Sequence, residues 1–166
     1  MSTLQEIQEL DSAHVMHCFA RLPVCFVRGE GARLWDTEGK EYLDFLAGIA
    51  VCALGHCHPR VTEAIREQAG RLVHTSNLYY NAEQARLAQL LGELSGGYKA
   101  FFGNSGAEAN EGAIKLARKW GKLNRGPECV TIFTALNSFH GRTLLTVSAT
   151  GQEKVKKNFD PRMPGF

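Results

Sequence analysis

The chain has 166 residues, of which 44% are hydrophobic and 22% are charged. This length and composition are typical of a soluble globular protein with a hydrophobic core. The formal net charge of +2, with Lys and Arg scattered along the chain, argues against a nucleic-acid partner, because such a partner requires a dense basic face.

Neither secretion nor a membrane location is indicated by the sequence. The N-terminal residues lack the basic start and apolar centre of a secretory signal. The longest apolar stretch, residues 45–55, is shorter than the roughly 20 residues that cross a bilayer. No Cys-x-x-Cys pair is present, so we expect reduced, mostly buried thiols in a cytoplasmic protein. The cysteines are Cys18, Cys25, Cys52, Cys57 and Cys129.

A loose helical segment and a small sheet are expected first in chain order. Residues 1–20 have the pattern of a helical lead-in. Between residues 24 and 46, short apolar runs alternate with turn signals at 29–31 and 37–39. This pattern predicts an antiparallel meander of two or three strands.

Two amphipathic helices are expected next. The first begins at Pro59, because proline suits the first helical position. The second follows Asn81, which can cap it together with Gln84, and ends at Gly96 and Gly97. Each helix has an apolar stripe: Val61, Ile65, Gln68/Ala69 and Leu72 in the first, and Leu87, Leu90, Leu91 and Leu94 in the second.

Another helix is predicted to begin after Ser105, a good N-cap residue, with Glu108 completing a capping box. Glu111 and Lys115 have the spacing of a surface ion pair. The predicted buried stripe of this helix consists of Ala109, Ala113, Leu116, Ala117 and Trp120.

The fold class predicted from these elements is α/β. Residues 98–103 and 128–134 read as strands on either side of the helix, which makes a β-α-β unit with parallel strands. We expect two parts, an N-terminal segment with short antiparallel strands over residues 1–55 and the start of a layered domain over residues 56–166.

Small residues at the junction of strand and helix predict an anion site. Ser105, Gly106 and Ala107 would let a phosphate approach free backbone N–H groups at the positive end of the helix dipole. No P-loop lysine and no Gly-x-Gly-x-x-Gly motif is present, which argues against nucleoside triphosphates and dinucleotides. A capped helix without any ligand remains the alternative.

A second group of candidate residues follows the second predicted strand. Phe139 and His140 form an aromatic pair, and Arg142 follows two residues later. An aromatic face can stack on a flat ring, and an arginine fork can hold a carboxylate. The alternatives are core packing for Phe139 and a solvated surface charge for Arg142.

The histidines before the Pro59 helix raise the question of a metal. His56, Cys57 and His58 do not have the spacing of a standard zinc site, and no second ligand pair follows. A turn that leads into the helix is the better interpretation.

Four segments together resemble the class III (ornithine/acetylornithine-type) aminotransferases. The resemblance covers residues 24–166 in the expected order, and it is strongest to the acetylornithine branch of the family. The segments are "DFLAGIAVCALGHCHP", "SNLYYN", "FFGNSGAEANEGAIKLARK" and "NSFHGRTLLTVSATG".

The resemblance implies an incomplete α/β fold type I PLP-transferase. It would comprise an N-terminal small-domain segment and the first part of the mainly parallel sheet of the large domain. The implied cofactor is pyridoxal 5'-phosphate (PLP), and the implied assembly is a homodimer. Ser105, Gly106 and Ala107 match the phosphate-binding turn, Phe139 the aromatic that stacks on the pyridine ring, and Arg142 the arginine that holds the substrate carboxylate.

The resemblance also implies a reaction. Tyr79 and Tyr80 resemble wall residues of the active site, with Tyr79 on the substrate side. The terminal amino group of N2-acetyl-L-ornithine would be transferred to 2-oxoglutarate, in arginine biosynthesis. Succinylornithine, ornithine and 4-aminobutyrate are alternative donors within the same family.

The family requires a lysine that anchors PLP and an acidic partner for the pyridine nitrogen. In the family both lie well downstream of the "FHGRT" motif, and no lysine of this chain matches the anchoring motif. We therefore expect the N-terminal part of an aminotransferase, inactive alone and unstable because of open sheet edges. The alternatives are a truncated, non-catalytic module that binds PLP or phosphate and one that caps a full-length partner.

Overall fold

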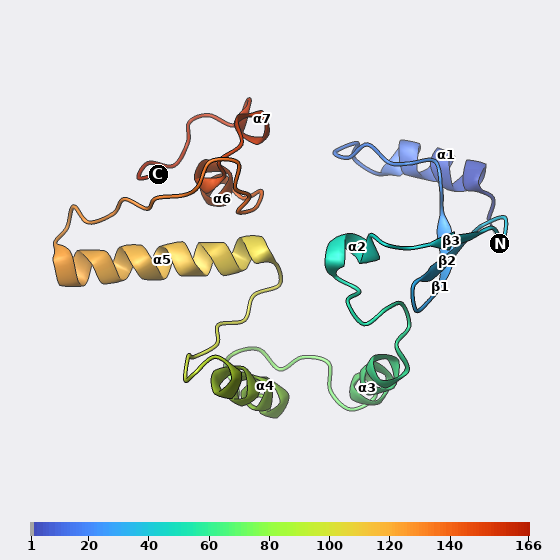
Figure 1. The fold of residues 1–166 in the computed structure, drawn as a ribbon, viewed down its shortest axis with the longest axis horizontal. Helices are drawn as coiled ribbons and strands as arrows, with labels where there is room; N and C mark the ends of the chain where they lie inside the picture. The colour runs from blue at the N-terminus through green and yellow to red at the C-terminus, as the bar shows by residue number, and fades with distance from the viewer. Residues whose placement is uncertain (1) are drawn as a thin grey trace. The chain divides into compact units, whose positions relative to one another are not determined.

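The computed structural model describes residues 2–166, shown as a ribbon in Figure 1. The chain divides into two compact units, the first ending at Tyr79 and the second comprising Tyr80–Phe166. Within the described residues, the helices are too short or too polar to cross a membrane.

The first unit contains the predicted lead-in helix and meander. Helix α1 (Leu4–His14) begins with a capping box in which Thr3 and Glu6 bond each other's backbone amides. Strands β1 (Phe26–Glu30), β2 (Arg33–Asp36) and β3 (Glu41–Leu43) form an antiparallel sheet in the order β1-β2-β3. The prediction of a meander is confirmed.

Asp36 shapes the turn between β2 and β3. One of its carboxylate oxygens accepts bonds of 2.9 Å from the backbone amides of Glu38 and Lys40, and the other accepts one from the Tyr42 hydroxyl. Burial raises the pKa of Asp36, but the bonds from Tyr42 and the two amides together outweigh it, so that this pKa lies below its usual value. The carboxylate thus takes the place of missing backbone partners in a tight turn.

Asp44 joins the sheet to the segment that leads into the next helix. Its carboxylate accepts bonds of 2.9 Å from the amides of Leu46 and Ala47 and lies 2.6 Å from Nε2 of His56. The backbone of His56 exchanges two hydrogen bonds with Gly31 in the β1–β2 turn. The "HCH" segment is therefore a structural turn that pins this segment to the hairpin.

Helices α2 (Ala47–Ala50) and α3 (Pro59–Ala69) complete the first unit. Helix α3 begins at Pro59, as predicted. Its apolar stripe is exposed, with Ile65 at 64% of its maximal surface, and it lines a groove of about 850 Å³ together with Leu54. The stripe was read correctly, but it has no covering element within the described part of this unit.

Helix α4 (Ala82–Leu94) opens the second unit and follows the sequence prediction closely. The Asn81 side chain accepts a 3.0 Å bond from the Gln84 amide. The helix ends before Gly96 and Gly97, which both have positive φ. The α4 leucines are exposed.

Helices α5 (Gly106–Arg125), α6 (Leu144–Ala149) and α7 (Glu153–Lys156) make up the packed part of the second unit. Helix α6 lies against α5, and α7 lies next to α6 (Figure 1). The strands predicted over 98–103 and 128–134 are not formed, because neither segment has a strand partner among residues 2–166. Residues 128–134 instead form an extended segment, in which the Ile132 amide donates a 2.9 Å hydrogen bond to the Gly165 carbonyl.

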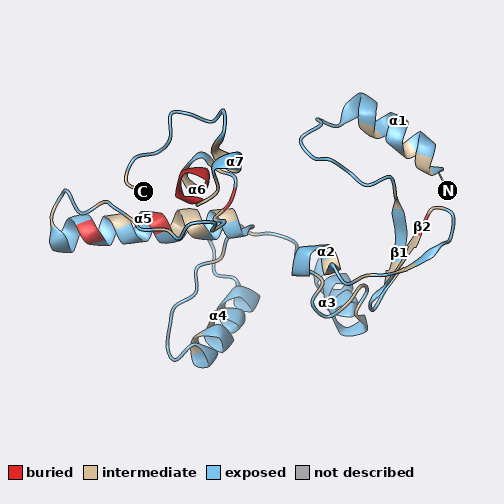
Figure 2. Ribbon diagram, turned by 45° about the horizontal axis from the view of Figure 1, so that its top comes forward, coloured by how far each residue is buried: buried red, intermediate tan, exposed pale blue. Residues whose placement is uncertain are grey.

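The face of α5 that packs is not the predicted one. Figure 2 shows buried residues on α6 and at two positions of α5, and the latter are Ile114 and Gly121. In the predicted stripe, Leu116 is 70% exposed and Trp120 is 54% exposed. The prediction failed because the packed face alternates the buried Ile114 and Gly121 with half-buried polar residues, so it forms no continuous apolar stripe.

All five cysteines are free thiols, but the prediction that most are buried is wrong. Cys18, Cys57 and Cys129 are exposed, and Cys25 and Cys52 are half-buried. The exposed thiols lie in connecting segments that no second layer covers.

Gly141 brings the segment before α6 against the first turn of α5. Its φ is 130°, and a Cβ at this position would lie 2.7 Å from both the Ala107 Cβ and the Thr146 Oγ1. Real Cβ atoms do not approach other atoms so closely, so this contact between segments requires glycine.

The Asp44 carboxylate predicts an acid-sensitive contribution to stability. The hydrogen bond with His56, followed by the one from the Ala47 amide, lowers the pKa of Asp44. A lowered pKa means that the contribution is complete above the unfolded pKa of about 4 and is lost as the pH falls through the lower folded value. We expect Asp44→Asn to lower the melting temperature at neutral pH, with the difference from the native protein shrinking below about pH 4.

Thermal unfolding followed by circular dichroism between pH 3 and 7 checks this. Glu38→Gln is the control, because the exposed Glu38 side chain makes no hydrogen bond with the described residues. An Asp44→Asn deficit that stays constant across this pH range would contradict the expectation.

Gly141→Ala is expected to destabilise the second unit more than Gly126→Ala does. Both glycines have positive φ, but a Cβ at Gly126 would meet no atom within 4 Å. The backbone cost of about 1–3 kcal/mol applies to both, and the clash at Gly141 adds about 1–3 kcal/mol. Urea unfolding of the two variants measures the difference, and equal losses would show that the contact with Ala107 is not tight.

Candidate functional site

The candidate site begins at the N-terminus of α5. The Ser105 hydroxyl caps the helix by accepting a 3.2 Å bond from the Glu108 amide, as predicted. The Glu108 carboxylate does not bond Ser105 in return but accepts the backbone N–H of Asn104. The predicted capping box is therefore only partly formed, because the Glu108 carboxylate accepts from the residue before the N-cap.

Three successive backbone amides remain available at this helix end. Within residues 2–166, the N–H groups of Ser105, Gly106 and Ala107 have no acceptor. Apart from its two neighbours and the backbone of its own helical turn, nothing in residues 2–166 lies within 4 Å of the point that a Cβ of Gly106 would occupy. Free amides, open space and the positive end of a 20-residue helix fit a phosphate group, such as that of PLP.

The loop 139–143 lies between α5 and α6 and is bonded to both. From α5, Asn110 donates a 2.8 Å bond to the His140 carbonyl, and the Glu111 carboxylate accepts a hydrogen bond from the Thr143 hydroxyl. On the other side, the His140 amide donates a 3.0 Å bond to the hydroxyl of Thr150, the C-cap residue of α6. The loop is therefore fixed through the His140 backbone and the Thr143 hydroxyl, which leaves the Phe139 and Arg142 side chains free for a ligand.

Phe139 and Arg142 are the exposed side chains of this loop. Phe139 is 56% exposed, and the Arg142 guanidinium carbon lies 5.8 Å from the centroid of its ring. Arg142 has no carboxylate partner within residues 2–166. An aromatic face beside an unpaired guanidinium suits a flat ring that carries, or lies next to, a carboxylate.

The structure thus brings together most of the residues singled out from the sequence. The contact of Gly141 with Ala107 places Phe139 and Arg142 on a loop that touches the first turn of α5. Tyr79 is 71% exposed and ends the first unit, so its role as a wall residue stays a prediction, as does that of Tyr80.

Asn110 and Glu111 are the site residues that the sequence reasoning missed. Glu111 was paired with Lys115 on the helix surface, but no such ion pair occurs among the described residues, and Glu111 bonds Thr143 instead. Spacing places Ala107, Asn110 and Glu111 on one face of α5, but it carries no signal for their bonding partners on the loop.

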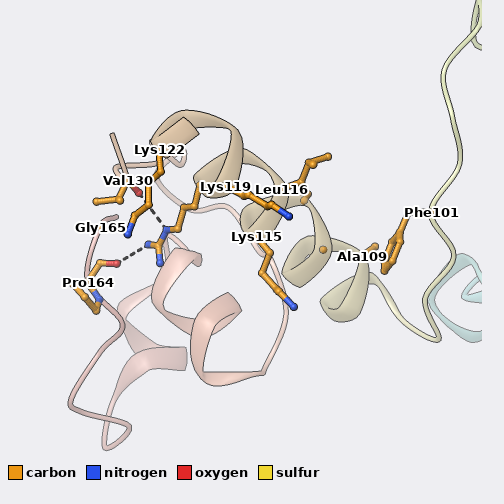
Figure 3. A pocket seen from close by; sticks show the side chains of 12 residues that line it. Phe101, Ala109, Lys115, Leu116, Lys119, Lys122, Val130, Pro164 and Gly165 are labelled. Carbon is orange, nitrogen blue, oxygen red and sulfur yellow. Dashed lines mark hydrogen bonds between the residues drawn. The ribbon is translucent and has the colours of Figure 1, made fainter. Parts of the chain in front are cut away.

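A separate groove of about 1050 Å³ lies on α5 (Figure 3). Its floor includes Ala109, Leu116 and Phe101, and lysines such as Lys115 stand around it. At one end, Arg118 donates bonds to the carbonyls of Val130 and Pro164. The groove is lined by none of the candidate site residues, so it is a different surface.

Known proteins resemble this chain over almost its whole length. A sequence profile of the class III aminotransferases matches residues 16–166. An acetylornithine aminotransferase of Caldanaerobacter subterraneus subsp. tengcongensis is 56% identical over 156 residues, which cover 94% of this chain and 40% of that protein. The chain therefore spans about two fifths of the length of this curated relative.

Solved structures of aminotransferases also match the fold of this chain. An ornithine aminotransferase from Toxoplasma gondii matches with a TM-score of 0.93 and 36% identity, over 100% of this chain and 40% of its own. An acetylornithine aminotransferase from Elizabethkingia anophelis matches with a TM-score of 0.79 and 41% identity, over 86% of this chain and 36% of its own.

These matches confirm the α/β fold type I class and, with it, PLP as the cofactor of the family. Within residues 2–166, the only sheet is the antiparallel β1-β2-β3 sheet, and the parallel sheet of the fold class is not formed. A specific profile match over residues 16–166 and a relative at 56% identity lead to one conclusion: this chain belongs to the class III aminotransferases.

Proposed function

We propose that the protein transfers the terminal amino group of N2-acetyl-L-ornithine to 2-oxoglutarate, as a PLP-dependent aminotransferase of arginine biosynthesis. The observation that carries the proposal is the contact between Gly141 and Ala107, at which a helix end with three free amides meets a loop with an exposed aromatic ring and an unpaired arginine. The name of the relative at 56% identity supports the choice of donor.

Each residue of the site has a distinct task in this proposal. The amides of Ser105, Gly106 and Ala107 bind the cofactor phosphate. The ring of Phe139 would stack against the pyridine ring of PLP and orient it. The Arg142 guanidinium holds a substrate carboxylate with two parallel hydrogen bonds, and this selects donors that carry a carboxylate at the correct distance from the reacting amine.

PLP supplies the electron sink when it is bound, while the protein supplies orientation and charge. The lysine that anchors PLP in the family is proposed to come from outside these 166 residues, since no lysine here matches the anchoring motif. The homodimer, the cytoplasmic location and a substrate-side role for Tyr79 belong to the same proposal, as expectations from the family resemblance.

The donor proposal is tested with protein expressed from the complete reading frame, supplied with PLP and 2-oxoglutarate. Glutamate formation is measured with N2-acetylornithine, succinylornithine, ornithine and 4-aminobutyrate. We expect kcat/KM to be highest for N2-acetylornithine. A higher value for ornithine or 4-aminobutyrate would overturn the donor, and PLP binding without turnover of any donor would overturn the enzymatic proposal.

Arg142→Ala is expected to raise KM for N2-acetylornithine about 10- to 100-fold, because a charged hydrogen-bonded pair contributes about 1.5–3 kcal/mol. Arg142→Lys should recover only part of this, since lysine lacks the planar fork. Arg125→Ala is the matched control, because the Arg125 guanidinium also lies over an aromatic ring, that of Trp120, at 5.6 Å. An unchanged KM in Arg142→Ala would contradict the assigned role.

A further inference from the structure

The hydrogen bonds that hold loop 139–143 on α5 come from two consecutive residues. Asn110 donates to the His140 carbonyl at 2.8 Å, and Glu111 accepts from the Thr143 hydroxyl. The two bonds reach the loop on either side of Gly141, the residue in contact with Ala107. Phe139 and Arg142 are therefore adjacent in sequence to residues that are fixed by α5.

Asn110 and Glu111 do not behave as solvent-exposed polar residues of a helix surface. Both are half-buried, whereas Lys115 and Lys119 on the same helix are exposed. The sequence separations of the two bonds are 30 and 32 residues, so these bonds link segments that local helix structure does not hold together. Both side chains turn from the helix toward the loop, and this role is available only in the folded second unit.

We propose that Asn110 and Glu111 are positioning residues of the active site. They set the loop that carries Phe139 and Arg142 relative to the first turn of α5, where the phosphate is bound. Helix α5 thereby provides the phosphate-binding amides and also fixes the position of Arg142, which holds the substrate carboxylate. The proposal rests on the proposed function for its catalytic consequence, but not for the attachment of the loop.

Loss of either bond leaves a loop group without its partner. In Asn110→Ala, the His140 carbonyl loses its donor, and in Glu111→Ala, the Thr143 hydroxyl loses an acceptor. Each alanine variant removes one hydrogen bond between the loop and α5, which favours an open loop by about tenfold. In Glu111→Ala, the Thr143 hydroxyl keeps its interactions with Thr146, so only the link to α5 is lost. The open loop displaces Phe139 and Arg142, so binding of substrate and of PLP weakens.

The test compares Asn110→Ala and Glu111→Ala with two further variants. Glu111→Gln keeps an oxygen that accepts from Thr143 and should restore native behaviour. Asn124→Ala is the matched control, because Asn124 is on the same helix and donates a 2.8 Å bond to Trp120, a residue of α5 itself. All variants are made in protein from the complete reading frame.

The first measurement is amide hydrogen exchange without PLP. The amides of His140 and Thr143, which bond to hydroxyls of Thr150 and Thr146, should exchange about tenfold faster in the two alanine variants. Amides in the centre of α5 should be unchanged. Native exchange at His140 and Thr143 in both variants overturns the proposal, whatever the enzymatic activity of the protein is.

The second measurement is the dissociation constant of PLP together with the kinetics. We expect about tenfold increases in the PLP dissociation constant and in KM for N2-acetylornithine, with a smaller change in kcat. Faster loop exchange with unchanged KM and PLP affinity would make the two residues merely structural and overturn their positioning role. An inactive native protein would refute the proposed function, while exchange and PLP affinity would still decide for or against the positioning role.

Discussion

The approach of Gly141 to the first turn of α5 is the contact on which the candidate site depends. Without a side chain, the backbone of the loop lies directly against Ala107, and a Cβ would come within 2.7 Å of it. The contact joins a helix end with three free amides to a loop with an exposed ring and an unpaired guanidinium. The proposed phosphate site and the proposed carboxylate site are neighbours because one residue lacks a side chain.

Helix α5 has two faces with different roles. Asn110, Glu111 and Arg118 lie on the face that receives the loop and the extended segment after α5, and each uses a polar group to do so. The opposite face includes the exposed Leu116 and contributes to an open groove, which Arg118 closes at one end. Hydrogen bonds at defined positions therefore fix where the loop and the extended segment lie on α5, and the opposite face does not contribute to this.

Local sequence rules predicted the helix starts well and the strands poorly. The cap at Asn81, the start at Pro59 and the cap at Ser105 depend on residues within one turn, and all three are confirmed. The segments 98–103 and 128–134 have strand-forming composition, but a strand requires a hydrogen-bonded neighbour, and none is present among residues 2–166. The antiparallel meander succeeded because its partners are adjacent in sequence.

The sequence by itself determined the family, the site motifs and the capped end of α5, because these depend on residue types at short, fixed spacing. Only the tertiary structure decided that Glu111 bonds Thr143 and not Lys115, and that the face of α5 with Ile114 and Gly121 is the packed one. The physical reason is the separation along the chain. A bond across 32 residues has no periodic signature in the sequence and forms only when the fold brings α5 and the loop together.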